Sequence, residues 1–206
     1  MGFYDDRILP RVIEVTCGGR GMDGLRRRAC APLSGAIVEV GFGSGFNVGN
    51  YPPEVTSVAA IEPSDLAWRR AAARVASSSI PIERAGLDGQ RLPFDDHSFD
   101  GALSTFTLCT IPDLSAALSE LRRVVKPGGR LAFLEHGLAP STSVQRFQHL
   151  IDPVEGALGG GCRLTRDIPA ELDAAGWRIV ENDRFYGKGV PKPWSAFNLG
   201  YAVCPG

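Results

Sequence analysis

Short runs of apolar residues alternate with longer segments of helical spacing through the middle of the chain. Five of the short runs predict strands, at residues 37–40, 55–61, 80–85, 101–107 and 130–134. Ser64 or Asp65 is placed to cap a helix that extends to about residue 77, and Asp113 is placed to cap another. The second helix carries a single apolar stripe, which predicts a core-facing side made of Leu114, Ala117, Leu118, Leu121 and Val125. This alternation predicts an α/β fold built on an open parallel sheet.

The first predicted strand leads directly into a glycine cluster, Gly41, Gly43 and Gly45. Glycines let the backbone turn sharply and approach a ligand where side chains would collide, although they also serve ordinary turns. The dinucleotide fingerprint Gly-x-Gly-x-x-Gly needs its third glycine at the position that Phe46 occupies. The spacing therefore favours a nucleotide-type loop other than the dinucleotide one.

An acidic residue, Glu62, closes the second predicted strand about 20 residues beyond the glycine loop, and Pro63 ends that strand. A carboxylate at this place can accept hydrogen bonds from a ribose diol. The loop and the acid together indicate a cofactor site more strongly than the loop alone.

Two motifs carry a family resemblance. The pattern Glu-Val-Gly-x-Gly-x-Gly at residues 39–45 resembles motif I of class I S-adenosylmethionine-dependent methyltransferases. The run Leu-Pro-Phe-x-Asp-x-Ser-Phe-Asp at residues 92–100 resembles the methyltransferases that include the ubiquinone and menaquinone C-methyltransferases. The resemblance implies S-adenosyl-L-methionine as cofactor and S-adenosyl-L-homocysteine as product. It implies a cofactor site that includes Glu39, Gly41, Gly43, Gly45, Asn47, Glu62 and Pro63.

The same resemblance assigns the residues just before the second motif. It implies that Asp88 faces the adenine amino group and that Gly89 offers its backbone amide to the base. His97 lies in the turn of the motif and is predicted to be solvated.

Further cofactor contacts are expected at two other places. Ligands of an open parallel sheet bind beyond the carboxyl ends of the strands, near the switch point between the first and fourth strands. Thr105 and Phe106 are therefore expected beside the sulfonium end of the cofactor. Apolar residues at helical spacing within residues 4–15 resemble the N-terminal lid of many small methyltransferases, which makes Tyr4 a candidate cofactor contact. The basic run at residues 26–28 is predicted to be a solvated helix face.

Three more segments, residues 105–111, 135–137 and 161–166, resemble a narrower branch of methyltransferases. Its mammalian members are alkyl-thiol S-methyltransferases, and it includes small bacterial relatives. The resemblance implies a Rossmann-like sheet of seven mostly parallel strands with helices on both faces. The sixth strand is expected near residues 177–180 and the last, antiparallel one near residues 199–204. The N-terminal hydrophobic anchor of the mammalian proteins has no counterpart in this sequence, so membrane residence is not expected.

The acceptor side is less well defined by the sequence. His136 follows the fifth predicted strand, where it is either a catalytic base or a histidine bonded to backbone. Cys109, Cys162 and Arg166 are candidate substrate-binding residues, and ordinary loop packing is the alternative for the last two. A covalent role for Cys162 is not expected, because a sulfonium donor needs no enzyme-bound intermediate. The glycine-rich segment 159–161 is a candidate mobile cover.

Length and composition narrow the class of protein. The 206 residues suit one domain. Within that domain the resemblance implies a helical lid at 1–30, a cofactor-binding core at 31–137 and a substrate-side half at 138–206. A formal charge of −1 supplies no general field for nucleic acid, so nucleic acid is not an expected partner. The chain has five widely spaced cysteines: Cys17, Cys30, Cys109, Cys162 and Cys204. Their spacing predicts neither a disulfide framework nor a metal site. Reduced thiols are typical of proteins in the cytoplasm, which is therefore the expected location.

The family resemblance and the residues that carry it imply a methyltransferase that uses S-adenosylmethionine and a small-molecule acceptor, with a thiol as one candidate. N-methylation of a phospholipid head group or of a small amine is the nearest alternative. A cofactor-binding protein without turnover is the alternative from another class, and a dehydrogenase is disfavoured by the glycine spacing. The sequence leaves the oligomeric state open.

Overall fold

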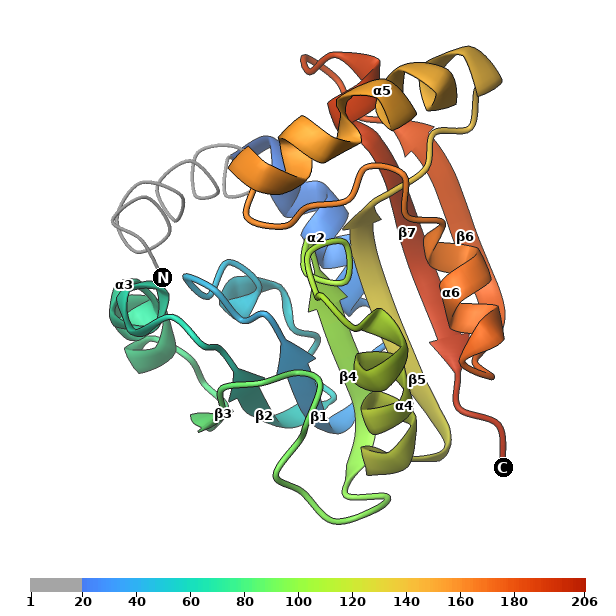
Figure 1. Ribbon diagram of the computed structural model, residues 1–206. Coiled ribbons are helices and arrows are strands. Elements are labelled where there is room, and N and C mark those ends of the chain that lie inside the picture. The colour runs from blue at the N-terminus through green and yellow to red at the C-terminus, as the bar shows by residue number, and fades with distance from the viewer. Residues whose placement is uncertain (1–19) are drawn as a thin grey trace.

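Within residues 20–206, which are those that the computed structural model describes, seven strands form one sheet (Figure 1). They are β1 (Gly35–Val40), β2 (Val55–Ile61), β3 (Ile82–Gly86), β4 (Phe99–Thr105), β5 (Val125–His136), β6 (Arg178–Tyr186) and β7 (Ala196–Val203). Their order across the sheet is β3-β2-β1-β4-β5-β7-β6. β1 to β5 run parallel, and β7 runs antiparallel to both β5 and β6. The predicted Rossmann-like sheet with an antiparallel last strand is confirmed.

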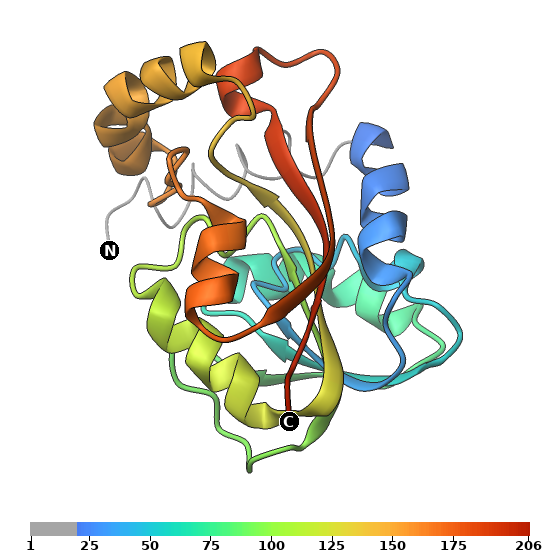
Figure 2. The ribbon, with the colours of Figure 1, turned by 90° about the vertical axis from the view of Figure 1, so that its right-hand side faces the viewer.

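Helices cover both faces of this sheet, as Figure 2 shows. One face carries α4 (Leu114–Val124) and α6 (Ile168–Ala174), which share a buried cluster with Val38 and Val40 of β1. The other face carries α2 (Asp23–Cys30) and α3 (Asp65–Ala76), which pack around Ile37 and Leu103. Adjacent residues of β1 therefore point into different cores, as the period of a strand requires. α5 (Thr142–Leu158) lies beyond the carboxyl ends of β4 and β5 (Figure 1).

Both predicted helix caps are present. The Ser64 hydroxyl accepts a hydrogen bond from the Ala67 amide at 3.2 Å, and the Asp113 carboxylate accepts one from the Ala116 amide at 2.9 Å. The apolar stripe of α4 is buried as predicted, except that Val125 already begins β5 and Val124 completes the helix. Short 3-10 turns occupy Arg20–Met22, Val48–Asn50 and Lys192–Trp194.

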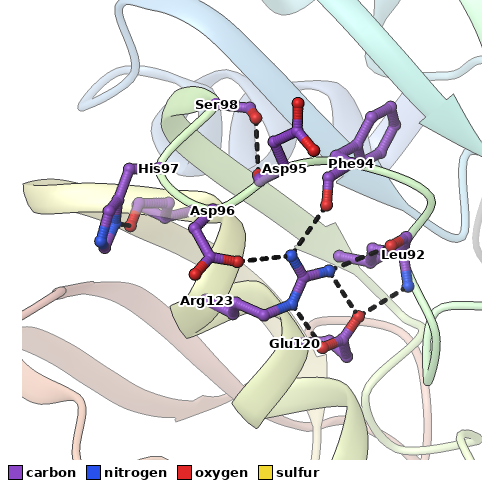
Figure 3. Close-up of polar contacts among 9 residues, drawn as sticks. Leu92, Phe94, Asp95, Asp96, His97, Ser98, Glu120 and Arg123 are labelled. Atoms are coloured by element: carbon purple, nitrogen blue, oxygen red, sulfur yellow. Dashed lines mark hydrogen bonds and ion pairs between the residues drawn. The ribbon is translucent and has the colours of Figure 1, made fainter.

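The Leu-Pro-Phe motif is held in place by Arg123 of α4 (Figure 3). The guanidinium of Arg123 donates to the carbonyl oxygens of Phe94 at 2.8 Å and Leu92 at 3.1 Å. It also pairs with the carboxylates of Asp96 at 2.9 Å and Glu120 at 2.7 Å, and Arg123 lowers the pKa of Glu120. A single side chain thus fixes the segment that joins the end of β3 to the start of β4. Some residues of the motif therefore serve to hold this segment in place.

The turn of the same motif holds His97 in the left-handed region, with φ of 57°. Its side chain is exposed, as predicted, and its Nδ1 lies 3.3 Å from the carbonyl oxygen of Val125 (Figure 3). Non-glycine residues adopt this region seldom, because Cβ crowds the backbone.

The predicted N-terminal helix at residues 4–15 lies outside the described residues. Across residues 20–206, no helix combines the length and the apolar character needed to cross a bilayer.

Candidate active site

The glycine loop follows β1 at the carboxyl edge of the sheet. Gly41 has φ of 72°, and a Cβ at this position would overlap the side chain of Thr107. Gly43 has φ of 59° and faces space: a Cβ there would find its nearest described atom, the carbonyl oxygen of Gly41, at 3.8 Å. The loop therefore needs glycine at Gly41 for packing, whereas at Gly43 it offers bare backbone to a ligand.

Glu62 lies at the end of β2, next to this loop. Its side chain is 5% exposed, and its two carboxylate oxygens accept hydrogen bonds from the amides of Gly43 and Ser64, each at 2.7 Å. Burial raises the pKa of Glu62, and the two amide donors oppose that shift. The structure thus brings the predicted ribose acid and the predicted loop into direct contact, and the exposed Pro63 follows at once.

The turn after β3 lies at the same end of the sheet as Glu62. The Glu62 amide donates to the carbonyl oxygen of Gly86 at 3.0 Å, which ties the ends of β2 and β3 together. A Cβ on Gly89 would lie 2.6 Å from Val40, so this turn passes directly over the end of β1. Asp88 is exposed there, and its carboxylate accepts a hydrogen bond from the Gln90 amide at 2.8 Å. Gly89 therefore lies beside the end of β1, the strand that leads into the glycine loop, and Asp88 is its neighbour in the chain.

The prediction of a solvated basic run is wrong for Arg26. This residue is 4% exposed, and its Nη1 donates to Asn47 Oδ1 and to Thr105 Oγ1, each at 2.9 Å. Arg26, Ala29 and Cys30 lie three and four residues apart and share the buried face of α2, whereas Arg27 and Arg28 are exposed. The helical spacing of Arg26 from Ala29 and Cys30 was the signal that could have identified it.

Asn47 and Glu39 extend this contact into what we call the polar cluster, namely Arg26, Glu39, Asn47, Tyr51 and Thr105. Asn47 Nδ2 donates to Glu39 Oε1 at 2.8 Å and to Thr105 Oγ1 at 2.9 Å, and the Tyr51 hydroxyl donates to Glu39 Oε2. Burial raises the pKa of Glu39 to about 7, against the hydrogen bonds from Tyr51 and Asn47 and the charge of Arg26. Glu39 therefore orders the base of the loop through its neighbours.

Phe106, directly after β4, adopts the left-handed region with φ of 56°. Its amide donates to the carbonyl oxygen of Leu134 at 2.8 Å, and its ring centroid lies 5.1 Å from that of His136 and 5.7 Å from that of Phe197. The Arg26 guanidinium carbon lies 5.3 Å from the Phe106 ring centroid. An aromatic residue in this backbone region is strained, and such residues concentrate at functional sites.

His136, Cys109 and Cys162 come together beside these rings. One potential ligand atom from each of the three residues lies within 4.8 Å of the other two, and the two sulfur atoms are 3.6 Å apart. Cys109 is 1% exposed and Cys162 is 8% exposed. Hydrogen bonding with Cys109, and then with His136, lowers the pKa of Cys162 against the opposing effect of burial. Cys109 and Cys162 are therefore far apart in the sequence but adjacent in the fold.

Two side chains hold the loop that carries Cys109. Arg166 Nη1 donates to the carbonyl oxygens of Leu108 at 2.5 Å and Ile111 at 2.9 Å. Glu135, which is fully buried, accepts from the amides of Thr107 at 2.9 Å and Cys109 at 3.3 Å. Arg166 therefore acts on the loop backbone in the way that the loop-packing alternative expected. The role of Glu135 was missed, although an acid that ends an otherwise apolar strand was a usable signal.

Comparison with known proteins places the chain in a family. Residues 38–133 match the family described as a methyltransferase domain. Human thiol S-methyltransferase TMT1A is 30% identical over 177 residues, which cover 82% of this chain and 70% of TMT1A. The chain belongs to the class I S-adenosylmethionine-dependent methyltransferases. S-adenosylmethionine is therefore its cofactor.

Two further comparisons set the limits of that assignment. Human thiol S-methyltransferase TMT1B is 31% identical over 155 residues, which cover 72% of this methyltransferase but only 62% of TMT1B. Haemonchus contortus phosphoethanolamine N-methyltransferase 2, solved with S-adenosyl-L-methionine, aligns with a TM-score of 0.68 and 14% identity over 98% of this chain and 59% of its own. The second likeness shows a shared fold, which hosts methyltransferases for different acceptors.

Proposed function

We propose that this methyltransferase transfers the methyl group of S-adenosylmethionine to a small-molecule thiol. Binding of the cofactor in this proposal rests on the hydrogen bond of 2.7 Å from the Gly43 amide to Glu62. This bond holds a carboxylate beside the open backbone of the glycine loop. The thiol half is supported by the names of the human relatives at 30% and 31% identity. The acceptor is therefore the part of the proposal that most needs an experiment.

The residues present fit the adenosyl part of the cofactor. In this proposal Glu62 accepts hydrogen bonds from the ribose hydroxyls, while Asp88 and the Gly89 amide bind the adenine edge. The open side of Gly43 lets the ligand approach the loop backbone. The positive charge of Arg26 lies toward β4, where it complements the carboxylate of the methionine part. Tyr4 stays a predicted contact, since it lies outside the described residues.

The proposal divides the chain by task. Residues 31–137 hold the cofactor, residues 138–206 supply much of the acceptor side, and residues 1–30 cover the cofactor. The rings of Phe106, His136 and Phe197 pack on one another, with centroids 5.1 to 5.7 Å apart, and form an aromatic wall at the carboxyl ends of β4 and β5. Such a wall keeps water away from the reacting atoms.

The chemistry asks little of the protein beyond alignment. S-adenosylmethionine supplies a methyl group that its positive sulfur already activates. A thiol of ordinary pKa, about 8.5, is only a few per cent thiolate at neutral pH, but that fraction is strongly nucleophilic. Holding a thiolate in line with the methyl group is therefore the main contribution expected of these residues. A strong base is helpful in this scheme but not required.

A panel of acceptors tests the proposal. The purified protein is offered an alkyl thiol, an ethanolamine lipid and a quinone precursor, and S-adenosylhomocysteine release is measured together with the mass of each product. We expect an S-methylated thiol in amounts equal to the S-adenosylhomocysteine released, and at least about tenfold slower release with the other acceptors. Preferred turnover of the lipid or the quinone precursor would replace the thiol by that acceptor. Tight cofactor binding without any product would indicate a cofactor-binding protein without turnover.

A further inference from the structure

Cys109, His136 and Cys162 form a cluster of three potential metal ligands. The three side chains come from different segments: Cys109 follows β4, His136 ends β5 and Cys162 follows α5. One potential ligand atom from each lies within 4.8 Å of the other two. We propose that these residues bind a divalent cation of the zinc type, with the fourth coordination position left for the sulfur of the thiol acceptor. The metal site stands on this geometry, and only the fourth ligand rests on the proposed function.

The sulfur spacing fits this assignment. Two thiolates about 2.3 Å from a tetrahedral zinc ion lie about 3.8 Å apart. The Cys109 and Cys162 sulfurs are 3.6 Å apart, close to that value. A disulfide would need about 2.05 Å and therefore a movement of both side chains. The observed pair matches two ligands of one ion without a change of backbone.

Hydrogen bonds between the three segments hold the donors in this arrangement. The Arg163 amide donates to the carbonyl oxygen of Cys109 at 2.9 Å, which joins the segment of Cys162 to the loop of Cys109. Glu135, the neighbour of His136, accepts from the Cys109 amide at 3.3 Å. Arg166 ties its own segment to the carbonyl oxygen of Leu108 at 2.5 Å. The segments that carry the donors are thus tied to one another before any ion binds, as an ordered metal site requires.

The surroundings also favour a bound cation. Cys109, Cys162 and Leu164 form a small buried cluster against Ile151 and Trp194, so bulk water is largely kept from the sulfurs. The carboxylate of Glu155, which accepts a hydrogen bond from Trp194 Nε1 at 3.0 Å, acts electrostatically on Cys162 and adds negative charge nearby. Soft thiolate and imidazole ligands select zinc-type ions over magnesium or calcium.

The donor set has a chemical consequence. Two cysteines and one histidine leave a tetrahedral ion one open position, as in catalytic zinc sites. Each of Cys109 and Cys162 gives up its thiol proton to solvent on binding, and the two thiolates balance the charge of the cation. A thiol acceptor that enters the open position likewise loses its proton to solvent. Its sulfur lone pair then forms the new bond to the methyl carbon as the carbon–sulfonium bond breaks. His136 is in this scheme a ligand, not a proton acceptor.

The proposed metal site can be tested by spectroscopy without measuring methyl transfer. The reduced full-length protein, free of cofactor, is titrated with Co²⁺ as a probe for the zinc-type ion. We expect one Co²⁺ per chain, a sulfur-to-cobalt charge-transfer band and the visible bands of tetrahedral cobalt. Cys109→Ser and Cys162→Ser should each lose about half of the charge-transfer band or more, since each removes one of the two thiolates. Cys204→Ser, which removes a buried cysteine elsewhere in the fold, should keep it. An alkyl thiol added to the cobalt form should intensify the band.

Several results would overturn the proposal. Absence of the band from the wild-type protein, or its survival in both the Cys109→Ser and Cys162→Ser variants, would remove the site. An unchanged band after thiol addition would remove the open position. If the variants do not fold, X-ray absorption of the zinc-loaded wild-type protein decides instead: two sulfur ligands and one nitrogen ligand support the site, and a shell of oxygen ligands contradicts it. None of these readouts depends on methyl transfer, so failure here leaves the acceptor panel as a separate test.

Discussion

Glu39 gives the structure a pH dependence that can be isolated with one substitution. The carboxylate is fully buried, and desolvation raises its pKa from 4.5 to about 7. In the unfolded chain the same carboxyl group titrates near its ordinary value. Between these two values the folded protein holds a proton that the unfolded chain has lost. Glu39 therefore stabilises the fold fully below about pH 4.5, and this contribution disappears as the pH rises to about 7.

The size of the effect follows from the two pKa values. One pKa unit corresponds to about 1.4 kcal/mol, so the change from 4.5 to about 7 amounts to about 3 kcal/mol. Glu39→Gln removes the titration but keeps a side chain that can bond to Asn47 and Tyr51. Burial also raises the pKa of Glu62 and Glu135, but these groups are present in both proteins. The difference between wild type and variant therefore isolates Glu39.

Urea unfolding at a series of pH values from 4.5 to 8 gives the required free energies of unfolding. We expect the wild-type value, minus that of Glu39→Gln, to fall by about 3 kcal/mol as the pH rises to about 7 and to level off above that pH. Glu54→Gln, at an exposed position just before β2, controls for the loss of one negative charge. A difference that stays constant with pH, or that grows as the pH rises, would refute the assignment of a raised pKa to Glu39.

Five further substitutions test separate parts of the fold and the site by urea unfolding. Gly41→Ala should cost more than about 2 kcal/mol, because the new Cβ overlaps the side chain of Thr107, whereas Gly43→Ala should cost only about 1 kcal/mol of backbone strain. Equal losses would contradict the packing argument. Arg26→Met should lower the free energy of unfolding by about 2 to 4 kcal/mol, because charge-assisted hydrogen bonds are lost. Arg28→Met, at an exposed position, should lower it by less than about 1 kcal/mol. The reverse order would be inconsistent with a buried Arg26. Arg123→Met should cost about 2 kcal/mol, and no loss would mean that the hydrogen bonds to Leu92 and Phe94 are unimportant.

Local patterns predicted what local chemistry determines. The strand at residues 55–61 and the caps at Ser64 and Asp113 were predictable because apolar runs and short polar side chains act within a few residues. The meeting of Glu62 with the glycine loop was predictable as well, since the carboxyl ends of parallel strands share one edge. Strand ends were less accurate: the fourth strand was placed two residues late, because Phe99 already pairs with β5.

Contacts between distant segments are not predictable from local patterns, because the partners lie far apart along the chain. Arg26 was assigned to a solvated face by its charged neighbours, yet its partners Asn47 and Thr105 are 21 and 79 residues away. Cys109 and Cys162 are 53 residues apart, so spacing along the chain gave no sign that the fold brings their sulfur atoms within 3.6 Å of one another. Rules that infer a metal site from residue spacing describe side chains on short sequence motifs. They do not detect side chains that the fold gathers from separate segments.

The most direct test of the cofactor site is a calorimetric titration of the purified protein with S-adenosylmethionine and, separately, with NAD. We expect binding of one S-adenosylmethionine per chain and no measurable heat with NAD. Glu62→Gln should weaken the S-adenosylmethionine affinity by about 10- to 100-fold, the range expected for the loss of a hydrogen bond to a charged group. A protein that binds NAD instead, or in which Glu62→Gln leaves the S-adenosylmethionine affinity unchanged, would contradict the placement of the cofactor between the glycine loop and Glu62.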